Sequence, residues 1–267
     1  MKLKRILPYK VLQIYTKLKW FYNHFSRIEY NSELRSTHYH GPITYDTDGL
    51  TTSNNADFIN DHKFQIAYNA AKKTNPWPGF TLQWRIYIVC WFANQIRYLN
   101  GDFVECGVNT GAYARAIIDY VNFNELDKTF YLFDTFEGLA NHQVTDKEVE
   151  AGINFYMGNH YKNVYQEVKT TFQDFNVKII KGEVPTSLKY FDGEKVAFLS
   201  IDMNVVAPEI AAADFFWDKL VIGGVILLDD YGFPMHINQK LAFDEFAKTH
   251  NQQILSLPTG QGVIIKR

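Results

Sequence analysis

The chain has 267 residues, of which 46% are hydrophobic and 21% are charged. This balance is typical of a globular protein that can bury a sizeable core. The formal net charge is −2, but residues 1–28 contain seven cations and no acid, so the remainder carries 20 cations against 29 acids. An acidic body of this kind repels the phosphate backbone of nucleic acids, and we therefore expect no nucleic-acid partner.

The two cysteines, Cys90 and Cys106, both lie in apolar runs, so we expect buried thiols and no disulfide framework. The first residues are basic, but Pro8, Lys10 and Gln13 interrupt the apolar core that a signal peptide needs. The sequence contains no run of about 18 apolar residues that would span a bilayer. These observations favour a cytoplasmic location.

Residues 7–25 repeat apolar side chains at helical spacing, opposite Lys10, Lys17 and Lys19. Such a stripe packs on the body of the protein, on a second subunit, or on a membrane. We expect a homo-oligomer. Peripheral contact with the anionic inner surface of a membrane stays an alternative, since the same segment is basic and aromatic.

The first hundred residues read as helices and loops. Tyr39–Asn55 is rich in Gly, Thr, Asp and Asn, which predicts a loop. Phe58–Lys73 and Leu82–Tyr98 are predicted helices, with a Pro- and Gly-containing break between them. We therefore divide the chain into a helical N-terminal extension and lid over residues 1–80 and a main domain over residues 81–267.

From Asp102 onward short apolar strands alternate with helices, which predicts a parallel sheet. The last two strands are joined by only four residues, too few for a crossover helix, so they must form an antiparallel hairpin. Parallel strands that end in such a hairpin are typical of the Rossmann-like α/β sheet of class I methyltransferases. The predicted strands span 103–108, 129–133, 177–181, 196–201, 225–228, 253–257 and 262–266, and the predicted helices 112–121, 208–220 and 235–250.

A glycine-containing turn follows the first predicted strand. Gly107 and Gly111 let the backbone approach a ligand closely, and the helix that begins near Gly111 directs free N–H groups at it. The pattern here is E-x-G-x-x-x-G, with Glu105 at the strand end. A carboxylate there repels a dinucleotide's diphosphate but suits the cationic sulfonium and amino groups of S-adenosylmethionine.

Two further acids follow the next strands of the sheet. Asp134 ends the second strand, where a carboxylate can accept both ribose hydroxyls. Glu183 follows the third strand, where the adenine edge would lie. Three polar sites in order on successive strand ends predict a cofactor site, although each alone is also typical of an ordinary turn.

Three aspartates end the fourth and fifth strands, which we expect to be neighbours. Asp202, Asp229 and Asp230 would then meet at the carboxyl edge of the sheet, where they repel one another unless a cation or protons intervene. Oxygen ligands alone favour Mg²⁺ or Mn²⁺ over Zn²⁺. We expect Asp202 to serve both as metal ligand and as the base that takes a hydroxyl proton. Histidines in predicted loops are alternative bases, although such side chains are usually solvated: His38, His40, His142, His160 and His236.

The chain resembles the macrocin O-methyltransferase family, whose members are metal-dependent and methylate sugar hydroxyls of antibiotics and related glycans. The resemblance covers roughly residues 75–267. It departs after Asp202, where family members of known activity often carry an acid and a tyrosine, and it is poor over 142–165 and the first seventy residues. The matching runs are Gly101–Val108, Phe133–Leu139, Ile201–Met203, Gly223–Val225, Leu228–Gly232 and Leu257–Gly262.

The resemblance implies a methyltransferase domain over residues 81–267 that binds S-adenosylmethionine and Mg²⁺, with Thr81 and Arg85 also touching the cofactor. It implies an O-methyltransferase for a small-molecule or glycan acceptor, such as a saccharide or a glycosylated metabolite. Two alternatives remain open: an enzyme for phenolic diols of the catechol type, and an inactive methyltransferase fold serving as a membrane-surface or scaffold protein.

Overall fold

The computed structural model describes residues 42–153 and 161–267, and Thr44–Arg267 form one compact unit. The predicted helix over residues 7–25 and the histidines His38, His40 and His160 lie outside the described residues. Within the described ranges, no helix is both long and apolar enough to cross a membrane.

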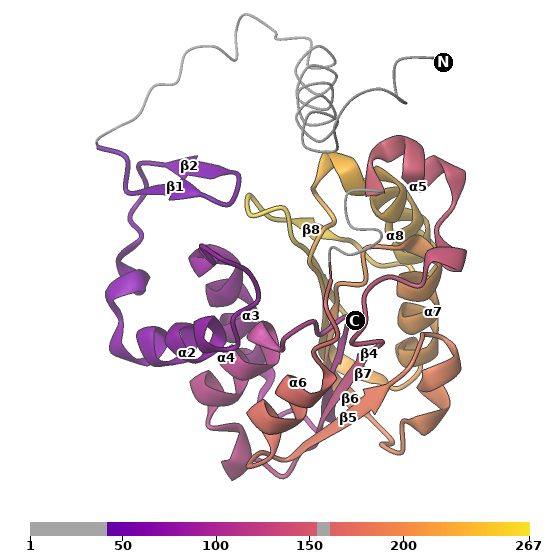
Figure 1. Cartoon of the computed structure of the whole chain (residues 1–267), viewed down its shortest axis with the longest axis horizontal. Helices are drawn as coiled ribbons and strands as arrows, with labels where there is room; N and C mark the ends of the chain where they lie inside the picture. The colour runs from indigo at the N-terminus through magenta and orange to yellow at the C-terminus, as the bar shows by residue number, and fades with distance from the viewer. Residues whose placement is uncertain (1–41, 154–160) are drawn as a thin grey trace, which may run out of the picture. The chain divides into compact units, whose positions relative to one another are not determined.

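A seven-stranded sheet organises the compact unit (Figure 1). Its strand order is β5-β4-β3-β6-β7-β9-β8, in which the first five are parallel and β9 runs antiparallel to both β7 and β8. The predicted Rossmann-like methyltransferase sheet with its C-terminal antiparallel hairpin is therefore confirmed. The strands are β3 Asp102–Cys106, β4 Phe130–Asp134, β5 Val177–Lys181, β6 Val196–Ile201, β7 Leu220–Leu228, β8 Leu255–Ser256 and β9 Gly262–Ile265.

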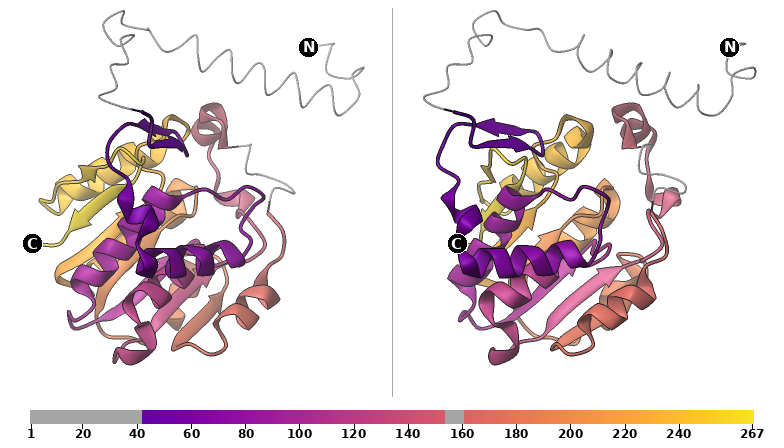
Figure 2. Two further views of the ribbon diagram at one scale, coloured as in Figure 1. Left: turned by 90° about the vertical axis from the view of Figure 1, so that its left-hand side faces the viewer. Right: turned by 60° about the vertical axis from the view of Figure 1, so that its left-hand side comes forward.

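Helices cover both faces of this sheet (Figures 1 and 2). Helices α2 (His62–Lys73), α3 (Gln83–Ile96), α4 (Ala112–Val121) and α6 (Tyr165–Phe172) lie on one face. Helices α7 (Val206–Trp217) and α8 (Ile237–Thr249) lie on the other, with the short α5 (Asp146–Ala151) packed on α8. Single-turn 3₁₀ helices connect them: η3 Asp57–Asn60, η4 Phe123–Glu125, η5 Asn141–Gln143, η7 Thr186–Tyr190 and η8 Pro234–His236.

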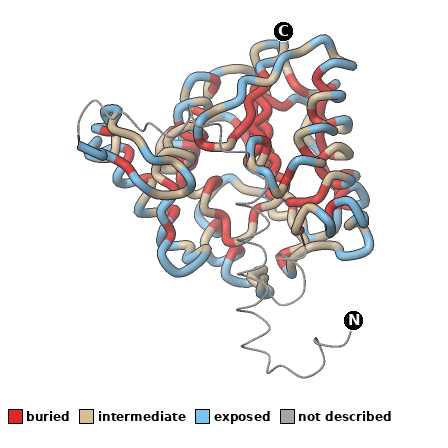
Figure 3. Tube along the Cα trace, turned by 90° about the horizontal axis from the view of Figure 1, so that it is seen from above, coloured by how far each residue is buried: buried red, intermediate tan, exposed pale blue. Residues whose placement is uncertain are grey.

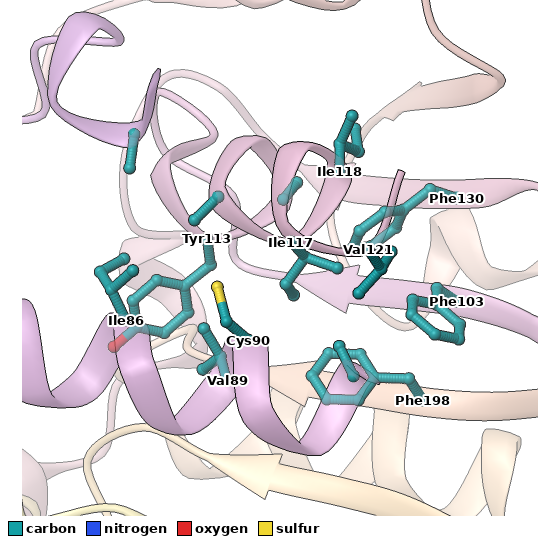
Figure 4. Packing of buried hydrophobic residues seen from close by; sticks show 14 of the residues in the cluster. Ile86, Val89, Cys90, Phe103, Tyr113, Ile117, Ile118, Val121, Phe130 and Phe198 are labelled. Carbon is teal, nitrogen blue, oxygen red and sulfur yellow. The ribbon is translucent and has the colours of Figure 1, made fainter. Parts of the chain in front are cut away.

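Successive residues of the central strands point to opposite faces of the sheet and enter two separate cores. On β3, Phe103 packs with α3 and α4, whereas Val104 packs towards α7 and α8. The central strands are buried on both faces (Figure 3), which explains why β6 and β7 are largely apolar along their length. Figure 4 shows the first core, where Tyr113 of α4 lies beside Ile86 of α3. Cys90 and Cys106 are free, buried thiols, as expected.

The prediction of a loop over Tyr39–Asn55 is wrong in its described part, because β1 (Tyr45–Thr47) and β2 (Leu50–Thr52) pair as an antiparallel hairpin. The two-residue turn between them is Asp48-Gly49, and both residues have positive φ, 55° and 75°. Asp-Gly is a preferred sequence for this turn, since its backbone twist matches that of the strands. The dipeptide was therefore the signal for a hairpin.

Candidate active site

Glu105 lies on β3, just before the turn that leads into α4, and only 3% of its surface is exposed. Its Oε2 atom accepts no hydrogen bond from the described residues. Burial raises the pKa of this carboxyl well above its ordinary value, and the nearby carboxylates of Asp134 and Asp229 raise it further. A buried carboxylate with a vacant acceptor is the kind of group that a cationic ligand stabilises.

The two glycines of the turn are close to protein atoms. Gly107 has φ 89°, and a Cβ atom on it would lie 1.8 Å from the carbonyl oxygen of Asp202. Gly111 has φ 87° and precedes α4, where a Cβ atom would lie 2.4 Å from the ring of Phe172. Any side chain at Gly107 would therefore push the turn away from the end of β6, which carries Asp202.

Asp134 ends β4 as predicted, and its carboxylate organises the same turn. Oδ2 accepts the backbone N–H groups of Val108 and Asn109, at 2.6 and 2.8 Å. Oδ1 accepts the N–H of Phe136 at 2.6 Å, whereas the nearby Thr135 hydroxyl, 3.3 Å away, donates to the carbonyl oxygen of Gly138 at 2.6 Å. Three backbone donors thus bind Asp134, and Oδ1 keeps the capacity to accept one further hydrogen bond. Burial nonetheless raises the pKa of Asp134.

Two other predicted cofactor contacts lie at the rim of this region. Glu183 follows β5 and its side chain is 45% exposed, with His142 Nε2 at 3.5 Å from its Oε2. Thr81 precedes α3, and its hydroxyl lies 2.8 Å from the hydroxyl of Thr47 on the β1–β2 hairpin. Both side chains are thus engaged with other parts of the protein and are open to solvent.

The three predicted metal ligands are brought together. Because β6 and β7 are adjacent and parallel, Asp202, Asp229 and Asp230 offer oxygen atoms that all lie within 4.8 Å of one another. Burial raises the pKa of Asp202 well above its ordinary value, with further increases from the other two carboxylates. Burial also raises the pKa of Asp230, to about 6. Asp202 and Asp230 therefore resist ionisation unless positive charge is supplied.

Asp229 has three protein donors and is only 4% exposed. Its Oδ2 accepts a 2.6 Å hydrogen bond from Arg85, while its Oδ1 accepts the Tyr113 hydroxyl at 2.5 Å and the Gln261 amide at 3.2 Å. The hydroxyl of Thr259 donates to Gln261 Oε1 at 3.0 Å, which turns the amide nitrogen of Gln261 towards Asp229. Arg85, expected at the cofactor, thus contacts the carboxylate cluster.

His236 differs from the solvated side chain expected of a loop histidine. It lies in η8, is 3% exposed, and its Nε2 is 3.6 Å from Oδ2 of Asp230. Its Nδ1 contacts Gln239, whose amide nitrogen donates to Glu209 at 2.8 Å. Burial raises the pKa of Glu209 to about 8. Proline at the first turn of η8 folds the chain back after Asp230, and this return buries His236.

Sequence reasoning missed three residues of the site: Asp48, Tyr113 and Gln261. Asp48 had a signal, the Asp-Gly turn described above. Tyr113 lies in the first turn of α4 and is hidden in an ordinary apolar helix pattern. Gln261 lies between the two C-terminal strands, where a glutamine is unremarkable until the hairpin folds back over β7.

Comparisons with solved structures find the same fold in O-methyltransferases. The O-methyltransferase NovP aligns with a TM-score of 0.59 and 18% identity, covering 76% of this chain and 88% of NovP. CalS11, a calicheamicin methyltransferase, aligns with a TM-score of 0.56 and 16% identity, over 86% of this chain and 99% of CalS11. An O-methyltransferase from Bacillus cereus, solved in complex with SAH, aligns with a TM-score of 0.51 and 10% identity, covering 77% of this chain and 91% of the Bacillus cereus enzyme.

A search among curated protein sequences found no match. Residues 90–256, which are more than half of the chain, match the family profile described as Macrocin-O-methyltransferase (TylF). This match includes β3 to β7 and therefore the strands that carry Glu105, Asp134 and the three aspartates. The chain belongs to the macrocin-O-methyltransferase family and is an S-adenosylmethionine-dependent O-methyltransferase.

Proposed function

We propose that this enzyme transfers the methyl group of S-adenosylmethionine to a hydroxyl of a saccharide or a glycosylated metabolite, with the help of Mg²⁺ or Mn²⁺. The observation that carries the proposal is the cluster of Asp202, Asp229 and Asp230 at the carboxyl edge of β6 and β7, beside the Glu105 turn. Its placement next to the turn puts a cation and a methyl donor within reach of one acceptor.

The buried groups of the turn fit S-adenosylmethionine. Glu105 offers its unpaired Oε2 to the positive charge of the methionine portion, and Asp134 holds the backbone of Val108 and Asn109 in place around the cofactor. Gly107, Gly111 and the exposed Glu183 complete the proposed cofactor contacts, with Thr81 at the rim. In this arrangement Asp134 acts mainly through the turn.

The carboxylate cluster fits a divalent cation, since its oxygen atoms converge and since burial, followed by the neighbouring carboxylates, raises the pKa values of Asp202 and Asp230. When bound, the ion lowers the pKa of a coordinated acceptor hydroxyl. Asp202 takes the hydroxyl proton on its carboxylate, and Asp229 and Asp230 hold the ion. The turn would orient the methyl group in line with the acceptor oxygen, so that the new C–O bond forms as the S–CH₃ bond breaks and S-adenosylhomocysteine leaves.

The family supports a glycosylated acceptor, because its description names macrocin and the similar CalS11 is a calicheamicin methyltransferase. A phenolic diol of the catechol type is the second candidate, since metal-assisted deprotonation acts on any vicinal diol. Retention of all three aspartates argues against an inactive scaffold. The acceptor itself would be selected by side chains outside the cluster.

The metal assignment is tested by chelation. We expect EDTA to abolish methyl transfer from labelled S-adenosylmethionine to a panel of glycosides and catechols, and Mg²⁺ or Mn²⁺ to restore it. Asp202→Asn should lower turnover by several orders of magnitude yet bind S-adenosylmethionine normally in calorimetry, because the cofactor contacts lie on β3 and β4. Full turnover in the chelated enzyme would refute the metal requirement. Methylation of catechols but of no glycoside would refute the assignment of a glycosylated acceptor.

Four further parts of the proposal concern the whole chain. The division into an extension and lid over residues 1–80 and a catalytic domain over 81–267 stays a prediction, as do homo-oligomer formation and a cytoplasmic location. Peripheral membrane contact through the basic N-terminal segment also stays a prediction, since residues 1–41 are not described.

A further inference from the structure

The tip of the β1–β2 hairpin is tied to the carboxylate cluster by one side chain, Arg85. Its Nε and one terminal nitrogen each donate to a different oxygen of Asp48, both at 2.7 Å, and its other terminal nitrogen donates to Asp229 at 2.6 Å. The side chains of Arg85 and Asp48 are 13% exposed and that of Asp229 is 5% exposed. A planar guanidinium thus bridges two carboxylates that lie 181 positions apart in the chain.

The contact with Arg85 is one of a few that join the hairpin to the body, alongside the buried ring of Tyr45, which packs edge-on against Trp84. A two-stranded hairpin of this length is marginally stable alone, so contacts with the body must hold it. Apart from Arg85, the hydrogen bonds that join it to the other described residues are the Thr47–Thr81 hydroxyl pair and a long one from the Tyr45 hydroxyl, which lies 3.5 Å from the carbonyl oxygen of Thr81 and 3.4 Å from Oε1 of Gln83. The ion pair between Arg85 and Asp48 is the one charged contact among them.

A second contact holds Arg85 beside the cluster without involving the hairpin. The ring of Phe233, three residues after Asp230, lies 4.9 Å from the guanidinium carbon, a distance at which a cation is attracted to an aromatic face. The positive charge of Arg85 therefore stays close to Asp229, where it repels any other cation. Asp48 neutralises part of that charge, since it binds other nitrogens of the guanidinium than Asp229 does.

We infer that Arg85 is a positioning residue that couples the seating of the β1–β2 hairpin to the affinity of the carboxylate cluster for a divalent ion. The inference rests on the metal site of the proposed function. Asp48 neutralises Arg85 when the hairpin is seated, and the cluster then binds the ion more tightly. When the hairpin moves away, Asp48 no longer neutralises Arg85. The guanidinium then interacts more strongly with Asp229 and competes with the ion. By reciprocity, binding of the ion favours the seated hairpin.

The test uses the full chain without acceptor and measures two quantities: Mn²⁺ affinity by electron paramagnetic resonance, and hydrogen exchange of the amides over residues 45–52 by mass spectrometry. Arg85→Gln should tighten Mn²⁺ about tenfold, and Asp48→Asn should weaken it about threefold, because these changes remove charges of opposite sign near the cluster. Both should accelerate exchange in the hairpin. Arg85→Lys should restore the wild-type affinity for Mn²⁺ but not the slow exchange.

Asp46→Asn is the matched control, since Asp46 lies on the same hairpin. Its carboxylate accepts a hydrogen bond from the Thr51 hydroxyl at 2.6 Å and makes no hydrogen bond or ion pair with Arg85. This variant should change neither the Mn²⁺ affinity nor the exchange by more than about twofold. Coupling predicts opposite changes in Mn²⁺ affinity for Arg85→Gln and Asp48→Asn. Loss of structure would instead weaken Mn²⁺ binding in both variants. Equal or unchanged affinities in these two variants would overturn this inference alone. A wild-type protein that binds no Mn²⁺ would overturn the proposed metal site as well.

Discussion

At the scale of single residues, Asp134 shows how one buried carboxylate can fix the backbone of the turn between a strand and a helix. Asp134 accepts three backbone N–H groups, two of them from the turn that carries Gly107 and precedes α4. Those N–H groups would otherwise be buried without partners, which is costly. The shape of the turn, and hence the fit of any ligand against it, depends on this one side chain.

We expect Asp134→Ala to weaken S-adenosylmethionine binding by about 2–3 kcal/mol, because the turn loses the charge-assisted bonds that fix it. The melting temperature should fall too, which a residue that contacted only the ribose would not cause. Calorimetric titration and thermal unfolding measure the two effects. Asp127→Ala, an exposed acid before the other end of β4, is the control. Unchanged cofactor affinity in folded Asp134→Ala would contradict this role.

At the scale of elements, the sequence predicted the sheet well because each central strand is a continuous apolar run whose end is marked by a polar residue. β5 and β6 have the predicted bounds, and α4 does as well. The strand β7 begins five residues earlier than predicted, at Leu220, because the turn at Gly223-Gly224 lies within a strand that shifts register against β6. Periodicity alone does not reveal such an irregularity.

The site was only partly predictable, for a different reason. The three aspartates follow from strand ends, since parallel strands bring their carboxyl ends to one edge. The donors to Asp229 come from α3, α4 and the last hairpin, at separations of 144, 116 and 32 residues. No local pattern specifies contacts of that range. His236 belongs to the same class, because the fold of η8 buries it.

The helix α5 illustrates how one acid can join two elements. Thr145 and Glu148 form a reciprocal capping box at its start, and the second oxygen of Glu148 accepts the N–H of Val206, the first residue of α7, at 2.7 Å. We expect Glu148→Ala to lower the free energy of unfolding by about 1–2 kcal/mol, because it removes the cap and the hydrogen bond to Val206. Denaturant unfolding measures it, with exposed Glu150→Ala as the control. Equal free energies of unfolding for the two variants would show that the hydrogen bonds of Glu148 between α5 and α7 do not stabilise the fold.

At the scale of the whole molecule, the free energy of unfolding should depend on pH because of the acidic cluster. A carboxyl whose pKa is raised by folding binds more protons in the folded than in the unfolded protein between its two pKa values. For Asp230 that window runs from about 4 to about 6. Without metal, stability contributed by the protonated group is therefore present below pH 4 and is lost as the pH rises through 6.

Mg²⁺ binds the ionised cluster, so it should raise the melting temperature little at pH 5 and most above pH 7. Thermal unfolding from pH 5 to 8, with EDTA or with Mg²⁺, checks this. Asp230→Asn should lose most of the Mg²⁺ effect at every pH, since it removes a ligand. A Mg²⁺ shift of the same size at pH 5 and pH 8 would show that the ion binds away from these carboxylates.

The position of the last strand has a consequence for how the enzyme is made. β9 is inserted between β7 and β8, and the residue just before it, Gln261, supplies a donor to Asp229. On the ribosome, β3 to β7 emerge first and leave the edge of β7 open to pairing with other chains. That edge is closed, and the surroundings of Asp229 are complete, only once Gln261 and β9 have emerged. Until then the nascent chain is open to aggregation at β7 and lacks one of the donors to Asp229.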